Sequence, residues 1–307
     1  MTRSYPVLIG TLAFVWGASY LFIKVAVEEI EPAPAMFLRL AVAAALLVPF
    51  VLWREGVGAG LAQLRDAWQA GVVLGLVNTA LPFTLIAWGE THIDSGVAAV
   101  ANATVPLFNA LLVMRILPSE RLSGTRLVGV ALGFVGVAVL AGGHPGGGWW
   151  GVAGTLAVVA ASFAYALGGI YGQIRVRGTA GPVLAAAAMV GGSLWLLPLA
   201  VVQAPTDAPG WKAVGSILAL AVLGTAFAQL VVFRALRLHG ASRLSLVTYL
   251  MPPIALVYGA LLLDETITAA AIAGLALILA GVAVGSGVLR LPRREPKPEA
   301  EPVAPRP

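Results

Sequence analysis

Long apolar segments dominate this sequence and decide what it can fold into. A helix needs about 20 apolar residues to cross the hydrocarbon core of a bilayer. Only 11% of the 307 residues are charged, against about 25% in a typical soluble domain. We therefore predict an all-α integral membrane protein with ten transmembrane helices, at residues 6–27, 35–53, 69–90, 94–115, 125–142, 150–173, 182–203, 212–234, 241–263 and 267–289.

The basic residues are distributed unevenly between the segments that connect these helices. With the N-terminus placed inside, 16 of the 19 Lys and Arg residues fall on the inner side, and the outer loops contain only Lys212. Lys and Arg accumulate in cytoplasmic loops, so we expect both termini in the cytoplasm and the protein in the cell inner membrane. The same bias accounts for the pI of about 9.9, and we expect no nucleic-acid partner.

An internal repeat relates the two halves of the chain. Residue types recur 145 positions later at several places: Gly129 as Gly274, Gly136 as Gly281, Gly142 as Gly287, Glu120 as Glu265 and Tyr20 as Tyr165. Each copy contains five predicted helices, an odd number, so the second copy would be inserted upside down. Inverted repeats with a binding site between them are typical of secondary transporters. We expect five-helix repeats at 1–145 and 146–289 and, from its Pro-rich charged composition, a disordered cytoplasmic tail at 290–307.

Polar and aromatic side chains recur near the middle of the predicted helices. Hydrogen bonding between helices is one explanation of such residues. A ligand cavity, with aromatic walls and a few polar groups, is the other. We favour the cavity because two amides, a Trp and two tyrosines lie at matching depth. The candidate substrate-binding residues are Trp16, Tyr20, Asn78, Thr79, Asn102, Tyr165, Gln229 and Tyr249.

Three prolines lie within the predicted third, fourth and ninth helices: Pro82, Pro106 and Pro252. A proline inside a helix removes a backbone hydrogen bond and kinks the helix. Such kinks are either static or bend during function, and we take these three as candidates for gating.

Two basic side chains, Lys24 and Arg39, lie near the outer ends of the first two predicted helices. Their long stems let the charge reach the membrane surface, where outer glutamates such as Glu28 offer ion pairs. The functional alternative is a basic outer vestibule that attracts a carboxylate.

Several motifs follow one another in a fixed order: Trp16-Gly17…Lys24, Arg39, a Pro…Glu-Arg-Leu…Gly…Gly block closing the first half, and Tyr249-Leu-Met-Pro252…Asp264-Glu265-Thr…Gly274…Gly281. Their order, spacing and duplication over about residues 5–288 resemble the EamA-type family of the drug/metabolite transporter superfamily. The stretches Asn78-Thr-Ala-Leu-Pro82-Phe and Asn102-Ala-Thr-Val-Pro106-Leu-Phe are similar to its aromatic-amino-acid exporter branch. The resemblance implies two inverted five-helix halves that export amino acids or other small metabolites, with the helix pairs three–four and eight–nine as gates.

We accordingly predict a secondary transporter that exports amino acids, aromatic ones among them, or related small metabolites, by alternating access. A nucleotide-sugar or sugar-phosphate carrier is the alternative, but a phosphate calls for Lys or Arg in the central cavity, and the sequence places none at mid-helix. A lipid-modifying membrane enzyme or a non-transporting scaffold is the alternative from another class. The sequence shows no Ser–His–Asp set and no paired mid-helix carboxylates, so we expect no enzyme.

Metal and cofactor sites are not expected either. There are no cysteines, and the three histidines have no ligand spacing. We expect a small-molecule substrate in a lipid bilayer, and a monomer with a dimer as the alternative. Acidic residues fall at helix ends, in loops or in the tail, which favours facilitated transport over proton coupling. If protons are coupled, Glu90 and His92 are the first residues to neutralise.

Overall fold

The computed structural model describes residues 4–116, 124–143, 148–176, 178–240, 244 and 246–285. Within these residues the regular structure is helical and includes no β-strand. The first part of the chain forms α1 (Ser4–Val27), α2 (Pro32–Glu55), α3 (Val57–Asp66), α4 (Trp68–Gly75), η1 (Leu76–Ala80), α5 (Leu81–Glu90), α6 (Ser95–Asn102), α7 (Val105–Ile116) and α8 (Gly124–Gly142). The second part forms α9 (Trp149–Arg175), α10 (Gly181–Val202), α11 (Trp211–Ala219), η2 (Leu220–Phe227), α12 (Ala228–His239), α14 (Val247–Leu262) and α15 (Ala269–Gly285).

Seven helical runs are long and apolar enough to cross a membrane: Tyr5–Val27, Pro32–Glu55, Trp68–Glu90, Ser95–Val113, Trp149–Arg175, Gly181–Val202 and Trp211–His239. Three shorter apolar helices, Leu127–Gly142, Val247–Leu262 and Ala269–Gly285, fall within the fifth, ninth and tenth predicted spans. The expected all-α membrane architecture is thus confirmed. The tail 290–307 and the edges 241–243 and 286–289 of the last two predicted spans lie outside the described residues.

Two of the three prolines that the sequence suggested for gating are the second residue of a helical segment. Pro82 is the second residue of α5, directly after the π-helix η1, and Pro106 is the second residue of α7. A proline is tolerated in the first turn of a helix because its missing N–H has no intrahelical partner there, and this applies to Pro106, which follows the turn at residues 103–104. Pro252 instead lies inside α14, next to Pro253. The helical runs therefore change their bonding pattern at the first two prolines.

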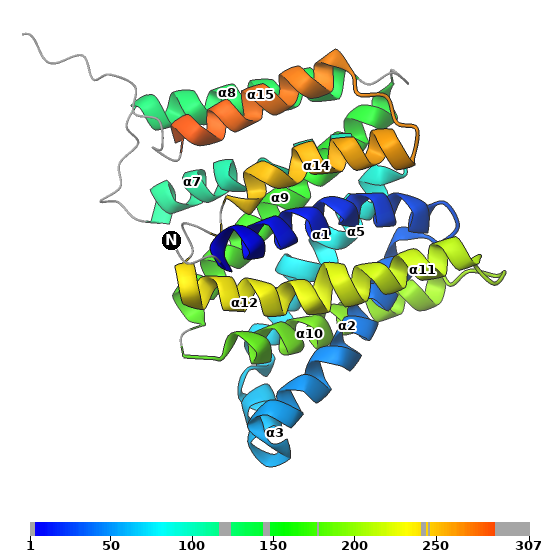
Figure 1. Ribbon diagram of the computed structural model, residues 1–307, viewed down its shortest axis with the longest axis vertical. Helices are drawn as coiled ribbons and strands as arrows, with labels where there is room; N and C mark the ends of the chain where they lie inside the picture. Colours follow the sequence, from blue (N-terminus) through cyan, green and yellow to red (C-terminus); the bar gives the residue numbers. More distant parts are fainter. Residues whose placement is uncertain are drawn as a thin grey trace, which may run out of the picture.

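Helices from the two parts of the chain pack against each other. Helix α1 lies against α14, α2 against α10, α5 against α9 and α8 against α15. In Figure 1 the α8–α15 pair forms one end of the molecule and α3 the opposite end.

Helices α8 and α15 approach each other closely at glycines. A Cβ at Gly129 would lie 2.7 Å from the Gly281 carbonyl oxygen, and one at Gly136 would lie 2.9 Å from that of Gly274. Any larger side chain would therefore separate the two helices. Because the residue numbers run in opposite directions along the contact, the two helices are antiparallel.

Candidate functional site

Three buried polar side chains bond to one another between helices α1, α6 and α9. The Asn102 amide Nδ2 donates to the Tyr20 hydroxyl at 2.7 Å, and the Ser162 Oγ donates to Asn102 Oδ1 at 3.0 Å. Their exposed fractions are 4% for Tyr20, 7% for Asn102 and 0% for Ser162. Asn102 is the last residue of α6, where the helix gives way to the turn before α7. We call these three residues the Tyr20–Asn102–Ser162 cluster.

Arg39 on α2 also lies in the interior, with 4% of its surface exposed. Its Nε donates to Thr225 Oγ1 at 2.9 Å, and its guanidinium carbon lies 3.8 Å from the centroid of the Phe83 ring. The Phe83 ring in turn contacts the Tyr165 ring edge-on, with centroids 6.4 Å apart. The guanidinium lies close enough to Tyr20 and Tyr165 to interact electrostatically with both side chains. Arg39 is therefore an interior residue, whereas the sequence suggested an outer vestibule.

Arg39 also brings a positive charge to the middle of another helical run. Thr225, its hydrogen-bond partner, lies midway along the helical run Trp211–His239, 14 residues from either end. The sequence placed no basic group at this depth because Arg39 is only seven residues from the start of α2. Its side chain points toward α5 and η2 rather than toward the loop, which the sequence alone does not reveal.

Lys24 fastens α1 to the loop between α5 and α6. Its Nζ donates to the Glu90 carbonyl oxygen at 2.6 Å and to the Ile93 carbonyl oxygen at 2.9 Å. Carbonyl groups at a helix C-terminus lack intrahelical partners, and a cation is favoured there. Within the described residues Lys24 forms no ion pair with Glu28, so the expected pairing with outer glutamates is replaced by these two carbonyl contacts.

The sequence placed Glu90 at a helix end, and the structure shows that it is fully buried there. Its exposed fraction is 0%, and neither carboxylate oxygen has a hydrogen-bond partner among the described residues. Glu265 is the opposite case, because its carboxylate accepts from the backbone N–H groups of Ser95 and Gly96 at 2.7 and 3.1 Å, at the start of α6. In the sequence, Glu90 stands at the end of an apolar run. Such a position is compatible with a buried residue and equally with an exposed helix end.

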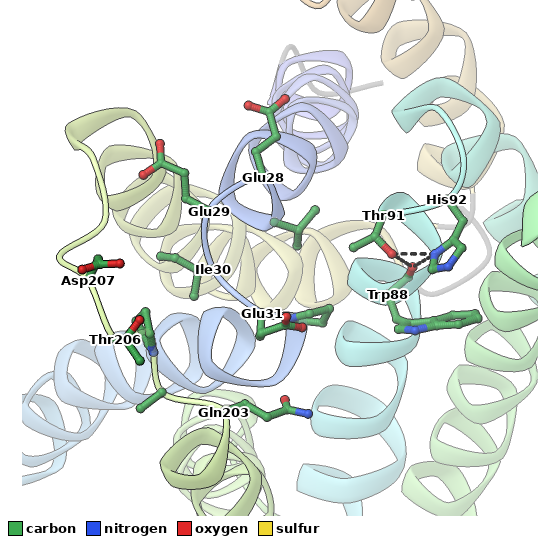
Figure 2. A pocket seen from close by; sticks show the side chains of 14 residues that line it. Glu28, Glu29, Ile30, Glu31, Trp88, Thr91, His92, Gln203, Thr206 and Asp207 are labelled. Atoms are coloured by element: carbon green, nitrogen blue, oxygen red, sulfur yellow. Dashed lines mark hydrogen bonds between the residues drawn. The ribbon is translucent and has the colours of Figure 1, made fainter. Parts of the chain in front are cut away.

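A pocket of about 610 Å³ opens where the α1–α2, α5–α6 and α10–α11 loops meet (Figure 2). Four carboxylates line it, together with Trp88 and His92 and without any Lys or Arg: Glu28, Glu29, Glu31 and Asp207. In Figure 2 the His92 ring and Thr91 stand beside Trp88, on the opposite side from Glu29 and Asp207. We call this cavity the acidic pocket. Its charge is the reverse of the basic vestibule that Lys24 and Arg39 suggested.

The other predicted site residues are buried or partly buried around this interior. Asn78 packs against α9, since a Cβ at Gly168 would lie 2.8 Å from its Oδ1. Thr79 donates back to the Gly75 carbonyl oxygen of its own helix at 2.5 Å. Trp16 and Tyr249 pack against the apolar core, and Gln229 is half-buried on α12. The structure thus joins Tyr20 to Asn102 and places Tyr165 beside Phe83, while no hydrogen bond within the described residues links Trp16 or Gln229 to them.

Comparison with known proteins places the chain in a family. The sequence profile of the EamA-like transporter family matches residues 4–142 and again residues 152–286. The chain belongs to the EamA-like transporter family. A solved crystal structure shares this fold, with a TM-score of 0.65 over 94% of this chain and 98% of the other at 19% identity.

Relatives of this EamA-like chain are themselves named as transporters. A transporter of Archaeoglobus fulgidus is 29% identical over 209 residues, which are 68% of this chain and 74% of the relative. A probable terminal-alkyne amino-acid exporter of Streptantibioticus cattleyicolor is 32% identical over 64% of this chain and 66% of its own length. The transporter YvbV of Bacillus subtilis is 27% identical over 67% and 68%. The family and these names indicate a membrane transporter rather than an enzyme.

Proposed function

We propose that this protein is a secondary transporter that exports amino acids or related small metabolites across the cell inner membrane by alternating access. The observation that carries the proposal is the convergence of buried polar and charged side chains from both parts of the chain in the interior. Tyr20, Asn102 and Arg39 come from the first part, and Ser162 and Thr225 from the second. Transporter sites lie between such repeats, and one relative is named as an amino-acid exporter.

We further propose ten crossings in two inverted repeats, with boundaries at 1–145 and 146–289. Two features of the fold support this proposal. The contact pairs Gly129–Gly281 and Gly136–Gly274 exchange with each other when residue numbers shift by 145, and they join antiparallel helices. The π-helices η1 and η2 begin at Leu76 and Leu220, 144 residues apart. π-Helical turns are rare overall and frequent at functional sites, so their recurrence within one residue of equivalent positions supports a duplicated design.

The orientation of the chain is part of the proposal. Both termini lie in the cytoplasm because the basic residues gather on that side. The acidic pocket then faces outward, between loops that contain Glu28, Glu29 and Asp207. The gating role of Pro82, Pro106 and Pro252 rests on the change of helical bonding at the first two and on the kink expected at the third.

Trp16, Asn78, Gln229 and Tyr249 belong to the proposed substrate site with the Tyr20–Asn102–Ser162 cluster. Half-buried aromatic and amide side chains next to a buried polar network suit a site that closes over a small ligand. In alternating access the two parts of the chain move against each other. The contacts between Tyr20 and the second-part residue Ser162, which run through Asn102, would then be remade in each cycle.

The proposal is tested by ligand-induced thermal stabilisation of the purified protein. The panel contains the common amino acids, a set of nucleosides and nucleotide sugars, and a set of sugar phosphates. We expect stabilisation by one or more amino acids, and a bound ligand at 100 times its Kd would stabilise by about 2.7 kcal/mol. Stabilisation by nucleotide sugars or sugar phosphates alone would contradict the amino-acid assignment and favour the alternative carrier.

A further inference from the structure

Arg39 is a buried cation that has no carboxylate partner among the residues that the structure describes. Its hydrogen bonds and cation–π contact among the described residues are with Thr225 Oγ1, Met36 Sδ (3.9 Å from Nη1) and the Phe83 ring. The ion pair that the described residues contain is elsewhere, between Arg54 and Glu55. Glu90 is within electrostatic reach of Arg39 but beyond ion-pair distance. Charged side chains inside membrane proteins are normally paired or functional. We therefore expect an anionic ligand to pair with this guanidinium.

These contacts give one edge of the guanidinium no strong acceptor among the described residues. An arginine has five N–H donors in a fixed planar fork. The Phe83 ring covers a face of the plane, and Thr225 takes the Nε–H. The Nη1–Nη2 edge, whose one contact is the weak acceptor Met36 Sδ, keeps the paired donors that match a carboxylate. Stacking and the Thr225 bond hold the fork in place before a ligand arrives.

Arg39 lies deeper in the protein than the acidic pocket, along the same two helices. Pro32 and Trp88 line that pocket, and they lie on the same helices as Arg39 and Phe83. Pro32 and Arg39 are seven residues apart on α2, and Phe83 and Trp88 are five apart on α5. At a helical rise of 1.5 Å per residue these separations are about 10 and 8 Å. A molecule leaving Arg39 along these two helices would enter the acidic pocket next.

We infer that Arg39 binds the carboxylate of the transported molecule through its Nη1–Nη2 edge, and that the substrate is a zwitterion whose ammonium group faces the acidic pocket. The inference rests on the proposed transport function. A phosphate ester fits less well, because its two negative charges would meet one guanidinium and would then pass four pocket carboxylates. The other basic candidate, Lys24, is already bonded to two carbonyl oxygens.

The test compares ligands that differ only at the carboxyl group. L-Phenylalanine and L-phenylalaninamide are titrated against the purified protein, with thermal stabilisation as the readout of Kd. For the wild-type protein we expect phenylalanine to bind about ten- to a hundredfold more tightly than its amide, as for hydrogen bonds between charged groups. Arg39→Met should reduce this ratio to near one. Arg39→Lys should give a ratio between those of Arg39→Met and the wild type, since an ammonium keeps the charge but lacks the planar fork.

Arg54→Met is the matched control, because it removes a positive charge from a partly exposed ion pair outside the site. It should leave the ratio unchanged. An Arg39→Met protein that still prefers phenylalanine as strongly as the wild type would overturn the inference and leave the proposed function intact. If Arg39→Met does not fold, Arg39→Lys decides the matter by the same ratio.

A separate pair of ligands distinguishes failure of the proposed amino-acid transport from failure of the carboxylate site at Arg39. If the wild-type protein binds no amino acid, the amino-acid assignment fails, and the titration is repeated with 3-phenylpropionate and 3-phenylpropionamide. A preference for the acid that disappears in Arg39→Met would uphold the carboxylate site and overturn the zwitterion. Equal binding of acid and amide, or binding of neither, would overturn the inference as a whole.

Discussion

Replacing Asn102 by alanine tests whether the Tyr20–Asn102–Ser162 cluster takes part in transport. The change removes the 2.7 Å bond to the Tyr20 hydroxyl and the 3.0 Å bond from Ser162. Ser162 keeps an acceptor, because its Oγ also lies 3.2 Å from the Val158 carbonyl oxygen. The Tyr20 hydroxyl loses its donor while it remains buried.

The structure sets the size of the expected effect. Hydrogen bonds between helices in membranes average about 0.6 kcal/mol and reach about 1.7 kcal/mol, while an orphaned buried group costs about 1–3 kcal/mol. We expect Asn102→Ala to lower the unfolding free energy by about 1–3 kcal/mol and to weaken substrate binding by roughly ten- to a hundredfold. Ser162→Ala should cost less, because the hydroxyl that it removes was not the sole partner of Asn102.

The assay combines reversible unfolding in bicelles with transport in proteoliposomes. A double-mutant cycle with Tyr20→Phe and Asn102→Ala should give a coupling energy of about 0.6–1.7 kcal/mol. Transport should fall in both single variants. Additive stability effects would show that the two side chains do not interact. A clear coupling energy with normal transport in both variants would show that the cluster only joins helices.

Further predictions concern orientation, packing and the buried charges. In this cysteine-free chain, a cysteine placed at Ala208 should react with an impermeant thiol reagent from outside intact cells and one at Thr179 should not; labelling of the second site from outside would refute the orientation. Gly136→Leu should separate α8 from α15 and lower the yield of folded protein on size-exclusion chromatography, whereas an exposed Ala-to-Leu change at Ala208 should not. Lys24→Met should lower the unfolding free energy by about 1.5–3 kcal/mol, measured in the same bicelle assay, since it loses bonds to two carbonyls. Glu90→Gln should leave stability at pH 7 equal or higher, because an unpaired buried carboxylate is costly to keep charged; a loss above about 1 kcal/mol would contradict its unpartnered state.

The helical architecture followed from sequence because it depends on composition along single helices. Lipid removes every alternative for a long apolar run except a helix or a closed barrel, so spans such as 6–27 and 182–203 matched α1 and α10 closely. The fixed rise of about 1.5 Å per residue along a helix also makes polar residues near the middle of a span visible in the sequence. Asn102 was found in this way and Tyr20 through its repeat counterpart Tyr165, and the two prove to be hydrogen-bonded to each other.

Side-chain direction and long-range contacts were not available from sequence. Arg39 sits near the start of its helix, and only the packing of α2 against η2 and α10 reveals that it turns inward. Lys24 had Glu28 one turn away, yet it bonds to carbonyl groups 66 and 69 residues later in the chain. Glu90 at a helix end resembles a solvated residue until the surrounding helices are in place. Each of these depends on which helices become neighbours, and a single sequence does not specify that.

Counterflow in proteoliposomes tests the central claim most directly. Vesicles containing the purified protein are loaded with unlabelled amino acid and diluted into a trace of the same labelled compound, with no proton or sodium gradient. A secondary transporter that carries the amino acid by alternating access exchanges the two pools, so we predict a transient accumulation of label that is absent from protein-free vesicles. Accumulation should fall at least tenfold in the Asn102→Ala protein. No counterflow with any amino acid, from protein that is folded and stabilised by none of them, would contradict the account.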